Sequence, residues 1–147
     1  MKEITLNYKK ELLEKWKQGK LYKGWADKYP ETFDEIDIDL AKSQPKYHFG
    51  EWFVAVHYAQ DGYKSLLEKV GCLNHERKNK IVAQYVDFEK LMKIPKLPDL
   101  FVYKNNEFFF VEVKKENDSL GSEQEKCFKR IKKEFGCDVY LCNLESL

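Results

Sequence analysis

Two extended runs on either side of a pair of asparagines constrain this chain more than any other feature. The runs cover residues 99–104 and 107–115, and both are rich in Phe, Val and Tyr. Between them stand Asn105 and Asn106. Asparagine tolerates the positive φ that a two-residue hairpin turn requires, and aromatic and β-branched residues favour strands. The pattern therefore predicts a tight β-hairpin.

The predicted hairpin brings two acidic residues face to face. Counting outward from the turn sets Asp99 opposite Glu112, and the side-chain period of two puts Lys114 on the same face as Glu112. Opposed residues have Cβ atoms roughly 4.5–5.5 Å apart, where like charges repel. A divalent cation such as Mg²⁺ would account for the pair, because hard cations take carboxylate oxygens. The alternative is chance, since acid–acid–lysine trios also occur on solvated hairpins.

The order of polar residues through and beyond the hairpin resembles a nuclease signature. Pro98-Asp99 followed by Glu112-Val113-Lys114 is similar to the PD-(D/E)xK motif. The continuation Asn117-Asp118-x-Leu120-x-x-x-Gln124 resembles the VRR-NUC (virus-type replication-repair nuclease) branch in particular. The match covers residues 97–143, about a third of the chain.

The resemblance implies a hydrolase that cleaves phosphodiester bonds in DNA with a divalent metal, in the service of DNA repair. Asp99 and Glu112 would bind Mg²⁺ or Mn²⁺, with the backbone carbonyl of Val113 as a further ligand. The metal would stabilise charge on the phosphate and lower the pKa of bound water. Lys114 would orient or activate that water, and Gln124 would be a second-tier positioning group.

A helix predicted over residues 47–61 precedes the sheet. Its apolar stripe recurs at helical spacing and consists of Phe49, Trp52, Phe53, Val56 and Ala59. Glu51 lies off the centre of this stripe. In the family a helix at this place often contributes an acid to the metal site, which makes Glu51 a candidate catalytic and metal-binding residue. The alternative is a solvated glutamate, as most are on amphipathic helices.

The helix predicted after the hairpin opens beside the proposed site. Ser122 and Glu125 can form a capping box, and Gly121, which stands where the branch usually has Ser, can also serve at the N-terminus. Gln124 is in line with the helix's apolar stripe, near the positive end of the helix dipole. A polar side chain there needs a hydrogen-bond partner. The resemblance suggests active-site water or the scissile phosphate.

The remaining patterns predict an α/β fold. The expected elements are a strand over 63–67, a helix over 74–92 whose 81–88 stretch would also serve as a strand, a helix over 122–135 closed by Gly136, and a last strand over 138–144. This order implies a mixed sheet flanked by helices. It agrees with the restriction-endonuclease-like fold that the resemblance implies, with the nuclease domain at residues 47–147.

Residues 1–46 are predicted to form a helical N-terminal extension packed on that core. A first amphipathic helix is indicated by Leu6, Leu12, Leu13 and Trp16, with Gly19 at its end. Thr32 and Glu35 have the spacing of a capping box, which would open a helix with Phe33, Ile36 and Leu40 on one face. The alternative is an extension that faces substrate or forms a dimer.

Any binding of nucleic acid must come from a local patch, because the formal net charge is only +1. Lys115, which stands where the branch usually has Gly, is expected to ring the catalytic cleft with Lys96, Lys126 and Arg130. Residues 69–80 hold a second group of basic residues. Either group is a phosphate-contacting patch or a solvated helix face.

Length and cysteine spacing bound the class of protein. The 147 residues suffice for one domain with a real core. The four cysteines show no CxxC pairing, which favours free thiols in a reducing cytoplasm. No apolar run reaches the length of a membrane span and no signal peptide is present, so we expect a soluble, cytoplasmic protein without a membrane partner.

The function that the resemblance implies is a structure-specific DNA endonuclease that acts on branched DNA or junctions. Small stand-alone members of the branch resemble junction-cleaving dimers, and Trp16, Tyr22 and Trp25 are the expected apolar patch of such a homodimer. Three alternatives stay open. They are a monomer that nicks flaps or single strands, a non-catalytic nucleic-acid or protein-binding module with a nuclease fold, and an RNA-cleaving defence nuclease.

Overall fold

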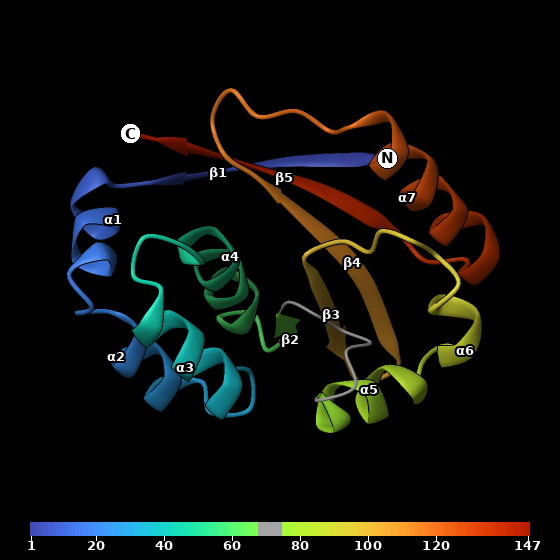
Figure 1. Ribbon diagram of the computed structural model, residues 1–147, viewed down its shortest axis with the longest axis horizontal. Helices are drawn as coiled ribbons and strands as arrows, with labels where there is room; N and C mark the ends of the chain where they lie inside the picture. The colour runs from blue at the N-terminus through green and yellow to red at the C-terminus, as the bar shows by residue number, and fades with distance from the viewer. Residues whose placement is uncertain (68–74) are drawn as a thin grey trace.

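One mixed sheet organises the molecule, which is described here from a computed structural model over residues 1–67 and 75–147. The sheet has the strand order β1-β5-β4-β3-β2, and α1–α4 gather on one side of the molecule with α5–α7 on the other (Figure 1). The elements in chain order are β1 (Lys2–Tyr8), α1 (Lys10–Lys17), α2 (Tyr22–Lys28), α3 (Glu35–Ser43), α4 (Phe49–Ala59), β2 (Lys64–Leu67), α5 (Glu76–Ala83), α6 (Phe88–Leu91), β3 (Leu100–Lys104), β4 (Glu107–Lys114), α7 (Ser122–Phe135) and β5 (Val139–Ser146). The predicted α/β fold with a mixed sheet is confirmed.

The central hairpin has the predicted turn and register. β3 and β4 pair antiparallel, with Lys104 opposite Glu107 and each pair further out following in step. Asn105 has φ +54°, in the left-handed region that the tight turn needs. The hairpin then pairs with β2 through β3 and, in parallel, with β5 through β4.

The two faces of the sheet bury two separate clusters of apolar side chains. Val111 and Leu100 point into a cluster shared with α1–α4, whereas the adjacent Phe110 and Phe101 point into a cluster shared with α5–α7. This alternation follows from the strand period of two. The first cluster is rich in ring–ring contacts, and Phe33 and Trp52 are stacked with ring centroids 3.8 Å apart.

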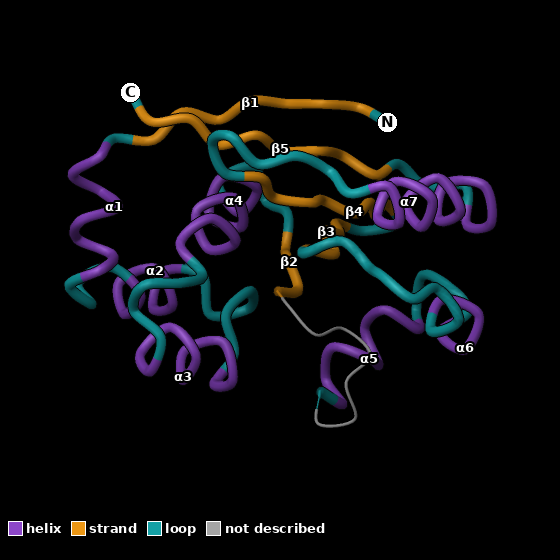
Figure 2. Tube along the Cα trace, turned by 45° about the horizontal axis from the view of Figure 1, so that its top comes forward, coloured by secondary structure: helices purple, strands orange, loops and turns teal. Residues whose placement is uncertain are grey.

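The first strand, β1, corrects the prediction that residues 1–46 are helical. Leu6 belongs to this strand and not to the first helix, which begins only at Lys10. Along β1 the partly buried Ile4, Leu6 and Tyr8 alternate with exposed residues, which is the period of a strand. β1 runs parallel to β5 along the outer edge of the sheet (Figure 2). β5 lies more than 130 residues away from β1 in the chain, so the local sequence of β1 could not predict this pairing.

Helix α3 begins with a different cap from the predicted one. Asp34 and Asp37 form the capping box: the Asp37 N–H donates to Asp34 Oδ1 at 3.0 Å, and the Asp34 N–H donates to Asp37 Oδ2 at 3.2 Å. Thr32 and Glu35 therefore do not cap it. The predicted apolar face is also wrong, because Ile36 is exposed while the charged Asp37 is buried.

A buried ion pair explains that orientation of α3. Lys78 is only 1% exposed, and its Nζ donates to Asp37 Oδ1 and to the Leu67 carbonyl, both at 2.7 Å. The pair ties α3 to α5 and to the end of β2. Lys78 is therefore unavailable to a phosphate-contacting patch over residues 69–80. Lys69 of that predicted patch lies outside the described residues.

The long helix predicted over residues 74–92 is in fact two short helices, α5 and α6. Asp87 stands between them in an extended conformation and accepts a hydrogen bond from the Lys90 N–H at 3.2 Å, so its side chain caps α6. The apolar spacing alone could not show this break. The predicted first residue, Asn74, lies outside the described residues.

Two of the three aromatic residues proposed as a dimer patch lie inside the protein, and Trp25 is partly buried against them. Trp16 and Tyr22 are buried, and Trp25 packs against Trp16 with ring centroids 5.9 Å apart. The indole N–H of Trp16 donates to the Tyr47 carbonyl at 2.9 Å. The prediction that these side chains form an exposed apolar patch is wrong, because helical spacing identifies a buried face without naming the surface that covers it.

The cysteines that the structure describes form no disulfide. Cys127, Cys137 and Cys142 are free and buried, whereas Cys72 lies outside the described residues. None of the helices in the described part of the chain has the length and apolar character that crossing a bilayer requires.

The Asp37–Lys78 pair predicts a pH-dependent stability. Lys78→Met should lower the free energy of unfolding by about 3–5 kcal/mol, because it leaves Asp37 buried without a counter-charge. Burial already raises the pKa of Asp37 to about 6, against an ordinary value of 3.8. A carboxyl with a raised pKa in the folded state favours folding as pH falls. The difference in the free energy of unfolding between the wild type and Lys78→Met should therefore become smaller as the pH falls from about 7 to about 5.

Urea unfolding at both pH values measures this prediction. Lys80→Met is the matched control, because Lys80 lies on the same helix and forms only an exposed ion pair with Glu76. A deficit for Lys78→Met no larger than that of the control, or one that grows at low pH, would contradict the assignment.

Candidate active site

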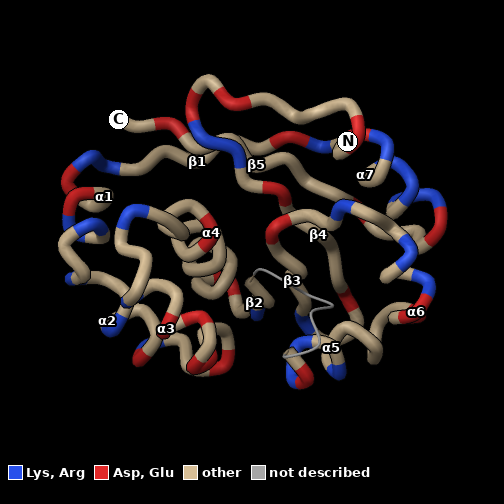
Figure 3. Tube along the Cα trace, in the orientation of Figure 1, with Lys and Arg blue, Asp and Glu red and all other residues tan. Residues whose placement is uncertain are grey.

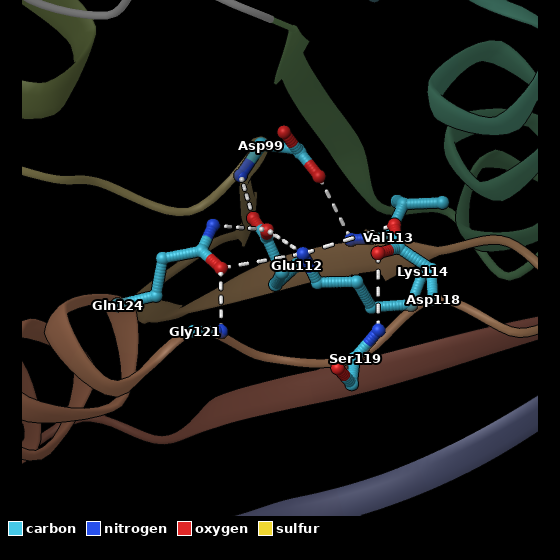
Figure 4. Close-up of polar contacts among 8 residues, drawn as sticks. All are labelled: Asp99, Glu112, Val113, Lys114, Asp118, Ser119, Gly121 and Gln124. Atoms are coloured by element: carbon cyan, nitrogen blue, oxygen red, sulfur yellow. Dashed lines mark hydrogen bonds and ion pairs between the residues drawn. The ribbon is translucent and has the colours of Figure 1, made fainter.

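Asp99 and Glu112 meet at the open end of the β3–β4 hairpin. Leu100 opposite Val111 is the last ladder pair, and Asp99 comes one residue before it. The Asp99 N–H donates to Glu112 Oε1 at 3.1 Å, and the Val113 N–H donates to Asp99 Oδ2 at 2.9 Å (Figure 4). Each carboxylate thus accepts a backbone hydrogen bond from the other strand. The residues predicted to oppose each other do so.

Lys114 lies against the same carboxylate. Its Nζ is 3.2 Å from Glu112 Oε2 and donates to Gln124 Oε1 at 3.3 Å, with Asp118 Oδ2 further away at 4.0 Å. Glu112 and Lys114 are only 4% and 8% exposed. Hydrogen bonds between ionised groups are strong, and burial strengthens them further. The position of the ammonium is therefore well defined.

Gln124 uses both ends of its amide within the protein. Its Nε2 donates to Glu112 Oε2 at 3.0 Å, while its Oε1 accepts from Lys114 and from the Gly121 N–H at 3.1 Å (Figure 4). Gly121 is thus the N-cap of α7, and the predicted capping box between Ser122 and Glu125 is not the one that forms. Both ends of the amide bond to protein groups, which is compatible with the predicted positioning role of Gln124, and its contact with water or phosphate stays a prediction.

The electrostatics of the site centre on Asp99. Burial, the charge of Glu112 and then the charge of Glu51 raise the pKa of Asp99 to about 8, while the hydrogen bond from the Val113 N–H opposes them. Glu51 lies in the first turn of α4. The structure therefore brings this glutamate close enough to act on Asp99, and three carboxylates contribute negative charge here.

The donor chemistry fits a hard divalent cation. Figure 4 shows the second Asp99 oxygen turned away from the hydrogen bonds of the network. Across residues 1–67 and 75–147, no three Asp, Glu, His or Cys side chains gather into a complete ligand set. Mg²⁺ is ordinarily held by one or two carboxylates, with water and substrate phosphate completing its coordination. Asp99 and Glu112 satisfy that requirement, and the Val113 carbonyl stays a predicted ligand.

The basic residues expected around the cleft are dispersed. Lys115 follows the last residue of β4 and lines hollows beside Glu51. Lys96 Nζ lies 3.7 Å from Glu123, and Arg130 pairs with Glu134 at 3.2 Å while contacting the Lys93 carbonyl. Figure 3 shows basic positions recurring along α7 as well as at the end of β4. Phosphate contacts by Lys96, Lys126 and Arg130 stay predictions.

The sequence analysis missed a segment just before Glu51. Gln44, Tyr47 and His48 line a hollow together with Glu51 and Lys115. His48, the N-cap of α4, has φ +72°. Proximity to Glu51 in the chain was the only available signal, because left-handed backbone at a histidine has no sequence signature.

A comparison with protein families identifies the family to which the fold belongs. A family model described as the VRR-NUC domain matches residues 32–145. This chain belongs to the VRR-NUC domain family. The resemblance carried by Asp99, Glu112, Lys114 and Gln124 is thereby confirmed, and the VRR-NUC domain implies a nuclease. No curated protein matches the chain, and neither does any solved structure.

The bonding of Gln124 predicts its effect on cleavage by the VRR-NUC domain. Gln124→Ala removes a contact to Glu112, one to Lys114 and one to the Gly121 N–H, so we expect roughly 10- to 100-fold slower cleavage. Steady-state rates measure this effect. Ser122→Ala, an exposed neighbour in the same turn, is the control, and equal rates for the two variants would contradict the positioning role.

Proposed function

We propose that this VRR-NUC domain protein is a divalent-metal-dependent endonuclease that hydrolyses phosphodiester bonds in DNA. The observation that carries the proposal is the continuous bonding of Asp99, Glu112, Lys114 and Gln124 at one buried point of the sheet. A binding module would have no use for two mutually repelling carboxylates, one buried and one partly buried, beside an ammonium. Perturbed ionisable groups gathered in this way are typical of catalytic sites.

In this proposal the residues of the site have separate roles in metal binding and in activating water. Asp99 and Glu112 would hold Mg²⁺ or Mn²⁺ with the Val113 carbonyl, and Glu51 would add negative charge from α4. The bound cation supplies Lewis-acid charge at the phosphate and a water of lowered pKa. Lys114, held by Glu112 and Gln124, would orient the attacking water and offset the negative charge that develops on the phosphate.

We further propose that residues 1–46 form an extension packed on a nuclease domain at residues 47–147. Side chains from both parts share one apolar cluster, including Trp16 and Phe33 from the extension and Trp52 from α4. The extension also adds β1 to the sheet.

Asp99→Asn and Lys114→Ala should each abolish metal-dependent cleavage. Asp99→Asn keeps an oxygen for the Val113 N–H and removes one of the repelling charges, so its melting temperature should not fall. Calorimetry should show heat of Mn²⁺ binding for the wild type and none for Asp99→Asn. Asp39→Asn, at an exposed position on α3, is the matched control. Cleavage that survives both substitutions would sink the enzymatic assignment, and an inactive wild type that binds no Mn²⁺ would favour the non-catalytic module.

The proposed substrate is branched DNA, and a panel separates it from the alternatives. Single-stranded, duplex, flapped and four-way DNA, together with RNA, are incubated with the protein in Mg²⁺ and in Mn²⁺. Preference for the four-way or flapped DNA supports the proposal. Cleavage of RNA alone would assign the protein to the defence nucleases.

We propose a homodimer as the working unit, built on a different surface from the predicted aromatic patch. β1 ends the strand order, and its outer edge pairs with no strand of the described chain. A two-fold axis beside β1 would continue the sheet into a second copy and place two sites symmetrically.

Sedimentation equilibrium over a concentration series, with and without DNA, tests the dimer. We expect a mass near twice the 17.6 kDa of one chain. A mass that stays at that of one chain under every condition would leave a monomer that nicks flaps or single strands.

A further inference from the structure

Two adjoining hollows lie beside the proposed site and share Lys115. The first, of about 470 Å³, is lined by Gln44, Tyr47, His48, Glu51 and Lys115. The second is narrower, about 220 Å³, and is lined by Tyr8, Leu13, Lys17, Lys46, Phe49, Gly50, Lys115 and Leu144. The catalytic roles described above use only Glu51 from these two sets.

Tyr47 presents an aromatic ring to solvent from a fixed backbone. The residue is 62% exposed, although most rings in this chain pack in the core. Its carbonyl accepts from the Trp16 indole at 2.9 Å, and its N–H donates to the Gln44 carbonyl at 3.0 Å. The next residue, His48, has a left-handed backbone, which costs energy for a residue other than glycine. The segment is thus held rigidly while the ring is left uncovered.

The narrower hollow combines positive charge with an apolar floor. Lys17, Lys46 and Lys115 line it, and Leu13 and Phe49 belong to its apolar lining. Within residues 1–67 and 75–147, neither Lys46 nor Lys115 has a carboxylate within 4 Å, and Lys17 has only the exposed Glu14 at 3.7 Å. Such a hollow suits a phosphate and its sugar, because the charge is not already neutralised.

Both hollows adjoin the place where cleavage is proposed. Lys115 follows Lys114 directly in the chain, and Glu51 of the first hollow acts on the pKa of Asp99. Glu51 thus connects the first hollow, which Lys115 also lines, to the proposed point of cleavage. Lys17 and Leu13 come from the extension, ahead of the residues that match the family model.

We propose that these hollows form a subsite for one unpaired nucleotide of the substrate strand. Tyr47 stacks on the base, and Lys46 and Lys115, with Lys17, hold the neighbouring phosphates. A base within a duplex is stacked on both faces, so it reaches Tyr47 only when unpaired. The inference rests on the proposed nuclease function and deepens it: the substrate carries a single-stranded nucleotide next to the scissile bond.

Fluorescence of a short single-stranded oligonucleotide containing 2-aminopurine tests the stacking. The titration is done in EDTA, so that neither metal nor cleavage contributes. We expect quenching and full affinity for the wild type and Tyr47→Phe. Tyr47→Ala should lose the quenching and bind roughly 5- to 150-fold more weakly, the range that stacking of one base gives. Ile36→Ala is the control, because Ile36 is an exposed apolar residue on α3, away from the hollows. Equal quenching and affinity for Tyr47→Ala and the wild type would overturn the proposal.

The lysines and the unpaired state are tested in the same assay. Lys46→Ala and Lys115→Ala should each reduce the salt slope of binding by about one unit or less, whereas Lys23→Ala, exposed on α2, should leave it unchanged. A blunt duplex of the same sequence should show no quenching. Unchanged slopes, or quenching in the duplex, would overturn the subsite. The binding assay involves no cleavage, so its failure overturns only the subsite. The nuclease assignment is tested separately, and cleavage that survives both Asp99→Asn and Lys114→Ala would overturn it.

Discussion

The repulsion between the partly buried Asp99 carboxylate and the buried Glu112 carboxylate is the constraint on which the site depends. Asp99 and Glu112 sit across the open end of a hairpin where the sheet excludes water, and the pKa of Asp99 rises accordingly. The protein offsets this cost with reciprocal backbone hydrogen bonds, with the Lys114 ammonium and with the Gln124 amide. Bringing two carboxylates this close is unfavourable without a positive charge between them, and a bound divalent cation would relieve the repulsion, as the proposed function requires.

Gln124 shows how the second layer of the site is built from helix capping. Its side chain satisfies the N–H of Gly121 at the start of α7, and the same oxygen receives Lys114. The cap and the catalytic network are therefore one structure. Burial of Phe128 and Ile131 against the sheet fixes the helix, and the helix in turn fixes the amide.

The N-terminal residues serve the site indirectly, through packing. β1 extends the sheet, Trp16 holds the carbonyl of Tyr47, and Tyr47 precedes the left-handed His48 that opens α4 and presents Glu51. Substitutions in this part of the chain thus act on the acidic site through the position of α4. Tyr47 is the residue of this segment whose side chain is exposed to solvent.

Local sequence by itself determined the hairpin, its register and the motif residues. Asn105 adopts the required positive φ, and the strand period of two then places Asp99 beside Glu112 without further information. Tertiary structure decided the rest, because it depends on partners distant in the chain. β1 became a strand through pairing with β5, Asp37 was buried because Lys78 reaches it from α5, and Trp16 and Tyr22 were covered by α4 and its neighbours. The periodicity of apolar residues predicts which face of a helix or strand is buried. It does not predict which other element covers that face, because the free energy of burial depends on contacts in space and not on distance along the sequence.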